Sequence, residues 1–239
     1  MSACSIEPAS DALRVIAVPE RTWNDDVQQR VAELWAEEQR RSPALFEGTL
    51  LTFVARTDAG LLGRFVDYRY YVAQRRDPSL RSELAITPLS VCGLIDCAGE
   101  VAFAERSADS TQYPGAIELI PSGGIDKAQL REDGSVDHRA QLVQELAEET
   151  GIGAAEIVSV QMAALLRDEI DEVVDIASII VVTPAARAIA ERTIARGTGE
   201  HRALVWIAIA ALSDYLDRHR ASMVPTSHAL ASLYLRRPR

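Results

Sequence analysis

The chain has 239 residues, 48% of them hydrophobic and 25% charged, which is the composition of an ordinary globular protein that can bury a full core. Its 35 acidic and 25 basic residues give a formal net charge of −10, so the composition argues against nonspecific binding to nucleic acid or to an anionic membrane, which requires many basic contacts to phosphate. No segment reaches the roughly 20 consecutive apolar residues of a membrane span, and the first residues lack the pattern of a secretory signal. We therefore expect a cytoplasmic protein whose cysteines, Cys4, Cys92 and Cys97, are small core residues.

The first 85 residues are predicted to form an N-terminal extension built from a strand, a helix and a hairpin. The strand is predicted at residues 14–18 and the hairpin strands at 49–56 and 64–74, joined by the turn sequence DAGLLG. The helix is predicted at residues 25–40, where apolar side chains recur at helical spacing: Val27, Val31, Leu34 and Trp35. Two roles are open for this extension: it covers a pocket of the main domain, or it pairs with a second subunit in a homodimer.

The main domain is predicted to span residues 86–239. Strands are predicted in six segments, at residues 89–95, 101–106, 116–120, 157–166, 173–183 and 204–209. Helices are predicted in four segments, at residues 138–150, 184–196, 213–220 and 227–235. Strands and helices do not alternate regularly, which favours an α/β fold with a mixed sheet and helices on its faces over a doubly wound Rossmann fold.

The helix at residues 138–150 carries an unusual set of carboxylates. At about 100° per residue, its apolar side chains fall on one side and its polar ones on the other. The apolar set is Ala140, Leu142, Val143, Leu146 and Ala147, and the polar set is Gln141, Glu145, Glu148 and Glu149. The three glutamates repel one another and lie near the helix C-terminus, where the dipole disfavours negative charge. A hard divalent cation would compensate this cost, whereas the alternative is a solvated acidic helix face.

The surrounding segment resembles the Nudix box. That family pattern is Gly, five residues, Glu, seven residues, and then Arg-Glu-apolar-any-Glu-Glu-any-Gly-apolar. Residues 144–152 (QELAEETGI) match its second half at every position but the first, and residues 121–124 (PSGG) resemble the Pro-any-Gly-Gly approach to the box. The resemblance implies the Nudix α/β/α sandwich with a mixed sheet and a Mg²⁺- or Mn²⁺-dependent pyrophosphohydrolase.

The segment also departs from the family pattern. About six more residues than in the family separate Gly124 from Glu145, and AQLRED is a plausible insertion. Gln144 stands where the family has Arg, and no acid lies near Ser135 or Val136, where its partner Glu would fall. Because both partners of that ion pair are missing, no lone buried charge is left behind. We interpret this as the replacement of the family's ion pair by neutral residues.

Position in the box implies roles for its carboxylates. Glu145 and Glu149 correspond to the principal metal ligands, Glu148 to a further ligand or a supporting group, and the carbonyl of Gly124 to a backbone ligand. The same three glutamates are the expected catalytic residues, and the implied reaction is the attack of water on a diphosphate phosphorus. The general base is open between a glutamate of the box and the acids of residues 169–172, which are otherwise a polar turn.

Two further features are similar to Nudix proteins that hydrolyse nucleotide sugars. The first is residues 45–48 (LFEG) together with residues 67–69 (DYR). The second is residues 105–107 (ERS), which precede the Pro-Gly pair at residues 114–115. Both features lie ahead of the box, so the resemblance places substrate contacts in this part of the chain.

Specific substrate contacts follow from these features as predictions. Arg106 is predicted to pair with a phosphate and Glu118 to contact a ribose or sugar hydroxyl, and Tyr68 or Tyr113 to stack on a base. The alternatives are a surface charge for Arg106, an outward-facing acid for Glu118 and half-buried sheet residues for the tyrosines. His201 is assigned no role.

These observations lead to two hypotheses from different classes. The first is a Mg²⁺- or Mn²⁺-dependent diphosphatase for a small nucleotide substrate, a nucleoside diphosphate linked to another moiety such as a sugar or the ribose of ADP-ribose. A triphosphate hydrolase would keep the enzyme class and change the substrate. The second is a catalytically impaired Nudix-fold nucleotide-binding or regulatory module, which the missing Arg and Glu motivate.

Overall fold

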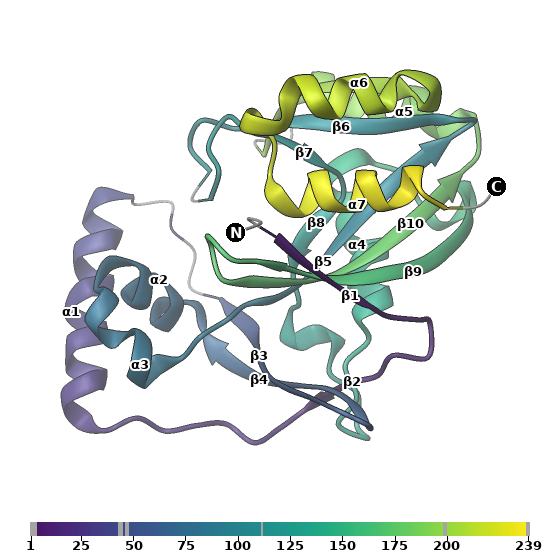
Figure 1. Cartoon of the computed structure of the whole chain (residues 1–239). Helices are drawn as coiled ribbons and strands as arrows, with labels where there is room; N and C mark the ends of the chain where they lie inside the picture. Colours follow the sequence, from purple (N-terminus) through teal and green to yellow (C-terminus); the bar gives the residue numbers. More distant parts are fainter. Residues whose placement is uncertain (1–3, 43–44, 46–47, 111, 198–199, 238–239) are drawn as a thin grey trace. The chain divides into compact units, whose positions relative to one another are not determined.

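The computed structural model describes residues 4–42, 45, 48–110, 112–197 and 200–237, and the chain divides into two compact units (Figure 1). The large unit comprises Met1–Ala12, Ser90–Gly123 and His138–Arg239, and the small unit comprises Leu13–Leu89 and Gly124–Asp137. The units thus depart from a simple division at residues 85 and 86, because each is built from separate stretches of chain. The predicted extent of a Nudix domain, residues 86–239, stays a prediction.

The large unit is built on an eight-stranded sheet. Its strands are β1 (Cys4–Pro8), β5 (Leu89–Cys97), β6 (Glu100–Arg106), β7 (Ile117–Leu119), β8 (Ser122–Gly124), β9 (Ile157–Asp168), β10 (Val173–Val182) and β11 (His201–Ala208). The main order is β1-β9-β10-β5-β6-β11, with β7 beside β6 and β8 beside β5. The pairs β1–β9, β9–β10, β5–β6, β6–β7 and β6–β11 are antiparallel.

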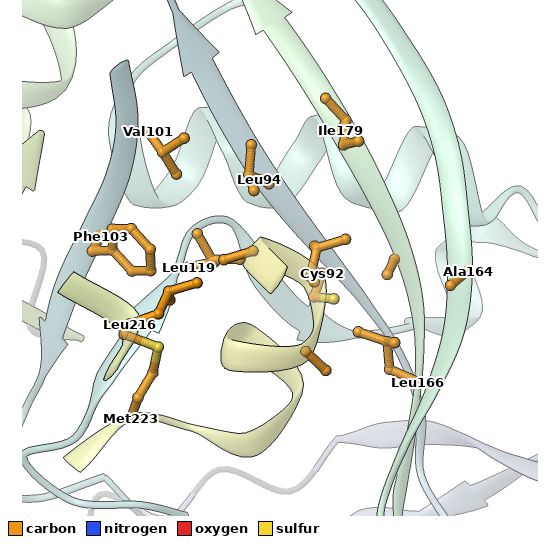
Figure 2. Packing of buried hydrophobic residues seen from close by; sticks show 14 of the residues in the cluster. Cys92, Leu94, Val101, Phe103, Leu119, Ala164, Leu166, Ile179, Leu216 and Met223 are labelled. Atoms are coloured by element: carbon orange, nitrogen blue, oxygen red, sulfur yellow. The ribbon is translucent and has the colours of Figure 1, made fainter. Parts of the chain in front are cut away.

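Helices cover both faces of this sheet. They are α4 (His138–Thr150), α5 (Ala185–Arg196), α6 (Ile209–His219) and α7 (Pro225–Leu235), with short 3₁₀ turns at Ala154–Glu156 and Arg220–Ser222. On one face Cys92 and Phe103 pack in one core with Leu216 and Met223, as Figure 2 shows. On the opposite face Val91 and Leu142 line the same small cavity, so α4 lies there. The alternation of β5 side chains thus produces helix, sheet and helix layers, which confirms the predicted fold class.

The small unit has a three-stranded sheet in the order β2-β4-β3. Its elements are β2 (Val15–Ala17), α1 (Asp25–Arg41), β3 (Thr49–Thr57), β4 (Gly60–Asp67), α2 (Tyr68–Arg76), α3 (Arg81–Leu84) and 3₁₀ turns at Pro78–Leu80 and Lys127–Gln129. The antiparallel β3–β4 hairpin and α1 confirm the sequence prediction. The side chain of Asn24 caps α1 by accepting a hydrogen bond from the backbone of Val27, as capping residues do.

One predicted strand is wrong in its second half. The strand expected at residues 64–74 ends at Asp67, and the chain continues as the helix α2. Helix α2 contains three tyrosines and a valine, which are typical of strands, but tertiary packing overrides this preference. Tyr68 packs edge-on against Trp35 of α1, and the buried amide of Gln74 exchanges two hydrogen bonds with the backbone of Ile86.

The sequence AQLRED, which is predicted to be an insertion, contributes to a small hairpin in the small unit. The hairpin spans residues 130–136 and is closed by a bridge between its ends. The backbone N–H of Val136 donates to the carbonyl of Val15, and the N–H of Ala17 donates to the carbonyl of Gly134. Each of these hydrogen bonds is 2.9 Å long. The residues that follow AQLRED, 134–136, therefore pair with the edge strand β2.

Two expectations from composition are also resolved. Cys92 and Cys97 are buried free thiols, which confirms their assignment as core residues, whereas Cys4 is only half-buried. Of the helices that the structure describes, none combines the length and the apolar character that crossing a membrane would need.

Gly151 ends α4 in a left-handed conformation, with φ of +72°, and its N–H donates to the carbonyl of Ala147. A Cβ here would also lie 2.5 Å from the hydroxyl of Thr193. Gly151→Ala is expected to destabilise the large unit by about 2 kcal/mol or more, because backbone strain adds to a steric clash. Gly99→Ala is the matched control, since Gly99 has φ of +86° and open space around it. If urea denaturation showed that both variants lose the same free energy of unfolding, the contact with Thr193 would relax at no cost.

Candidate active site

Helix α4, which carries the motif, directs a mixed polar and apolar stripe inward. The buried residues are Gln141, Leu142, Leu146, Glu149 and Thr150. Glu145 is half-buried and Glu148 is exposed, while Ala140 and Ala147, expected on the apolar side, are exposed. The three glutamates keep the helical spacing that predicts one arc, but this arc is not a solvent-facing side, because Glu149 is buried and Glu145 is half-buried. Hydrophobicity misleads here because the polar side chains of the stripe find hydrogen bonds inside the protein.

Glu149 is a buried carboxylate in which only one of the two oxygens has a hydrogen bond among the described residues. Its Oε1 accepts a hydrogen bond of 3.0 Å from the backbone N–H of Ser122, whereas Oε2 is buried and has no hydrogen-bond partner among the described residues. Burial raises the pKa of Glu149 well above its usual value, and the charges of Glu118, Glu200 and Glu145 raise it further, while the bond from Ser122 opposes the shift. A cation beside Oε2 would offset this unfavourable charge.

Glu145 lies one turn earlier on the same side of the helix. Its Oε1 accepts a hydrogen bond of 2.7 Å from the amide of Gln141. A Cβ placed on Gly123 would come within 2.2 Å of the Glu145 carboxylate, so this carboxylate lies directly over a glycine of β8. Gly124 ends β8 and opens the second stretch of the small unit, and its predicted role as a backbone ligand stays a prediction.

Glu148 differs from these two carboxylates in its exposure to solvent. It is exposed, and its Oε1 accepts a hydrogen bond of 2.8 Å from the amide of Gln144, the residue that replaces the arginine of the family pattern. The neutral Gln144 thus contacts the neighbouring turn of its own helix. The role of Glu148 toward a metal stays a prediction.

Arg106 and Glu118, the predicted substrate contacts, bind each other. Nη1 of Arg106 lies 2.7 and 2.6 Å from the two carboxylate oxygens of Glu118, and its Nε donates to the carbonyl of Gln112. Glu118 is only 3% exposed, and it also accepts from the hydroxyl of Ser122 at 3.4 Å. Each residue is thus engaged by the other within the protein, and direct contacts of either residue with a substrate stay predictions.

His201 is the residue that sequence reasoning missed. It begins β11 opposite Arg106, is 4% exposed, and its Nε2 lies 2.7 Å from Oε1 of Glu118. Its Nδ1 lies 3.9 Å from Oε2 of Glu149. Both of these atoms are buried without a hydrogen-bond partner in the described part of the chain. The sequence shows a histidine before a strand, but it does not show that β11 pairs with β6 and so brings the ring beside α4.

The other predicted residues lie in different places. The acids of residues 169–172 form the turn between β9 and β10, where Glu169 accepts a hydrogen bond from the hydroxyl of Ser5. Tyr113 donates a hydrogen bond of 2.5 Å to the buried Asp168, and Tyr68 belongs to α2 of the small unit. Of residues 45–48, Phe46 and Glu47 lie outside the described residues. The general base among these acids stays a prediction, and so does the stacking of Tyr68 or Tyr113 on the base of a nucleotide.

The donor set fits a divalent cation, although it is not yet arranged as a complete site. Among residues 4–42, 45, 48–110, 112–197 and 200–237, no three His, Cys, Asp or Glu side chains are grouped as metal ligands. Glu149 nevertheless presents a buried oxygen without a partner, with further acids around it. Carboxylate oxygens in such surroundings are the ligands that Mg²⁺ and Mn²⁺ prefer.

Comparisons with known proteins find similarity in structure only. No family model matches the chain, and no curated protein matches its sequence. The crystal structure of DR0079 from Deinococcus radiodurans is 14% identical over 78% of this chain and 99% of that chain, with a TM-score of 0.49. The NUDIX domain of Shewanella oneidensis NrtR, solved with ADP ribose, is 16% identical over 61% of this chain and 84% of that chain, with a TM-score of 0.44.

A NUDIX hydrolase from Nitrosomonas europaea is also similar. It is 11% identical over 61% of this chain and 86% of that chain, with a TM-score of 0.40. Proteins of the family that the motif resembles are thus among the solved structures similar to this chain.

Proposed function

We propose that the protein is a Mg²⁺- or Mn²⁺-dependent hydrolase that cleaves the diphosphate of a nucleoside diphosphate linked to another moiety, a nucleotide sugar or ADP-ribose. The observation that carries this proposal is the pair Glu145 and Glu149, which lie on the inward side of α4 against Ser122 and Gly123, with one buried carboxylate oxygen left without a partner among the described residues. A homodimer, a cytoplasmic location and the lack of nucleic-acid or membrane partners stay predictions.

In the proposed reaction the chain's own residues bind the cation and hold its carboxylate ligands in position. Glu145 and Glu149 would hold the cation, with Glu148 and the Gly124 carbonyl as further ligands. When bound, the cation neutralises charge on the phosphate oxygens and lowers the pKa of a bound water. Ser122 and Gln141 fix one oxygen each of the two main carboxylates, so their positions are set before the substrate arrives.

The substrate would be held by groups ahead of the box. Arg106 uses Nε and Nη1 in the contacts that the structure describes, which leaves Nη2 as the donor proposed for a substrate phosphate. Glu118 is proposed to contact a ribose or sugar hydroxyl. The general base is proposed among the box glutamates and the acids of residues 169–172, which contain carboxylates at a solvent-exposed turn.

The proposal is tested by a substrate screen with both products identified by mass spectrometry. Purified protein with Mg²⁺ or Mn²⁺ is offered nucleotide sugars, ADP-ribose, dinucleotides and nucleoside triphosphates. We expect a nucleoside monophosphate and the phosphate of the linked group as products. The absence of any cleavage with either metal would contradict the proposal, and cleavage of triphosphates alone would change the substrate class.

The second candidate is a catalytically impaired nucleotide-binding module. The observation in its favour is that Gln144 replaces the arginine of the family pattern and contacts the exposed Glu148. Calorimetry in the presence of a chelator distinguishes the two functions, because a metal-independent binder would retain tight nucleotide binding without forming a product.

Gly123→Ala is expected to weaken Mn²⁺ binding about tenfold while changing the free energy of unfolding little. The new Cβ would occupy the position of the Glu145 carboxylate, and this flexible side chain can move aside at little cost. Gly153→Ala is the control outside the proposed site, since a Cβ there would meet only the Glu156 carboxylate within 4 Å, at an ordinary contact distance of 3.4 Å. Calorimetric Mn²⁺ titrations of both variants check this, and equal affinities would show that the position of Glu145 over the glycine is unimportant.

A further inference from the structure

His201 belongs to the same buried cluster as the proposed metal ligand Glu149. Nδ1 of His201 and Oε2 of Glu149 lie 3.9 Å apart, which is too long for a hydrogen bond. The two side chains are each 2% exposed, and both atoms lack a hydrogen-bond partner among the described residues. Two unsatisfied polar atoms facing each other in a protein interior require an explanation, because buried polar groups are almost always paired.

The ring's other nitrogen indicates what Nδ1 offers. Nε2 lies 2.7 Å from the carboxylate of Glu118, which is also bound by Arg106. A carboxylate paired with a guanidinium accepts hydrogen bonds, so Nε2 carries the proton. In the neutral ring Nδ1 then presents a lone pair toward Glu149. Histidines that bind metals commonly donate their other N–H to a carboxylate in this way, which fixes the tautomer and the ring orientation.

The spacing of the two atoms suits an ion between them. Bonds from divalent cations to imidazole nitrogen and carboxylate oxygen are about 2.0–2.2 Å long, so a single ion reaches both atoms across the observed 3.9 Å. A positive charge there would satisfy both lone pairs and offset the acidic surroundings of Glu149.

We infer that His201 is a nitrogen ligand of the divalent cation, together with Glu149, and that Glu118 positions its ring. This inference rests on the proposed function and refines the nature of its metal site. A mixed nitrogen and oxygen donor set favours Mn²⁺ and later transition metals over Mg²⁺, because imidazole is a softer ligand than a carboxylate. The site is therefore expected to bind Mn²⁺ more tightly than Mg²⁺, with a preference that depends on His201.

Pulsed electron paramagnetic resonance of the full chain loaded with Mn²⁺ tests the inference directly, because it detects nitrogen bound to the ion. We expect a coupled imidazole nitrogen in the wild type, its loss in His201→Gln, and a weakening of Mn²⁺ binding by about tenfold or more. His228→Gln is the matched control, a half-buried histidine of the large unit that contacts Ser232, and it should keep the nitrogen signal.

A second variant separates positioning from ligation. Glu118→Gln should keep the nitrogen signal but weaken Mn²⁺ binding by roughly 10–100-fold, the usual effect of removing a group that orients a metal-binding histidine. Melting curves in a chelator establish whether each variant folds. If His201→Gln fails to fold, the wild-type spectrum alone decides.

The inference and the proposed function fail in different ways. Diphosphate cleavage by a wild-type protein whose bound Mn²⁺ shows no coupled nitrogen would overturn the role of His201 and leave the hydrolase in place. A nitrogen-coupled Mn²⁺ in a protein that cleaves no substrate in the screen would support the metal site and contradict the proposed activity.

Discussion

Glu149→Gln is expected to lower kcat by about a thousandfold and, in the metal-free protein, to raise the temperature of unfolding. The glutamine keeps an oxygen that can accept the hydrogen bond from Ser122, so the local geometry is retained. It removes a buried negative charge that burial and the neighbouring Glu118 and Glu145 disfavour, which stabilises the fold. It also removes the central ligand of the proposed cation, and a loss of about 4 kcal/mol in transition-state stabilisation corresponds to that fall in rate.

Glu148→Gln makes the same chemical change on the same helix at an exposed position, so it is the control for the effect of Glu149→Gln on stability. Its unfolding free energy should stay within about 0.5 kcal/mol of the wild type, as for most surface substitutions. Steady-state kinetics with the substrate found in the screen and melting curves in a chelator supply the two readouts. A Glu149→Gln protein that is fully active would refute the metal-ligand role. One that is inactive and also less stable would show that the carboxylate is mainly structural.

Local sequence signals predict the elements of this chain well where periodicity and a terminator agree. Helix α4 has the predicted bounds, because its apolar spacing is helical and Gly151 supplies a left-handed end. The helix α2 was missed because its tyrosines and Val72 favour strands, and only the packing against α1 reverses this preference. The strand β1 is short and polar, and its pairing with β9 is a long-range property that no local pattern records.

The candidate site shows the same division between local and long-range information. Motif spacing identifies Glu145 and Glu149, since both lie on one helix and the helical period fixes their relation. The motif spacing does not show that Glu149 points inward. Inside the protein its carboxylate accepts a hydrogen bond from Ser122, which belongs to a strand that is separate in the sequence. His201 is 52 residues further along the chain than Glu149, and only the pairing of β11 with β6 brings it into the site.

Asp175→Asn is expected to stabilise the large unit by an amount that grows with pH. Asp175 is buried in β10, where burial raises the pKa of its carboxyl from 3.8 to about 7; the charges of Asp168 and Glu118 add to the shift and a hydrogen bond from Thr226 opposes it. Between these two pKa values the folded protein holds a proton that the unfolded chain has lost, so stability falls as pH rises. The loss is about 1.4 kcal/mol per pH unit, or up to about 4 kcal/mol in all, and it is complete above about pH 7.

The difference between Asp175→Asn and the wild type isolates this carboxyl from other titrating groups. In urea denaturation, with amide exchange in β10 reporting on the large unit, the difference should increase from about pH 4 to about pH 7 and then remain constant. Asp217→Asn is the control, since this side chain is 72% exposed and pairs with Arg220 at the surface; its stability should follow the wild type at every pH. A difference independent of pH for Asp175→Asn would mean that the fold accommodates an ionised Asp175, because only a carboxyl that resists ionisation in the folded state links proton loss to unfolding.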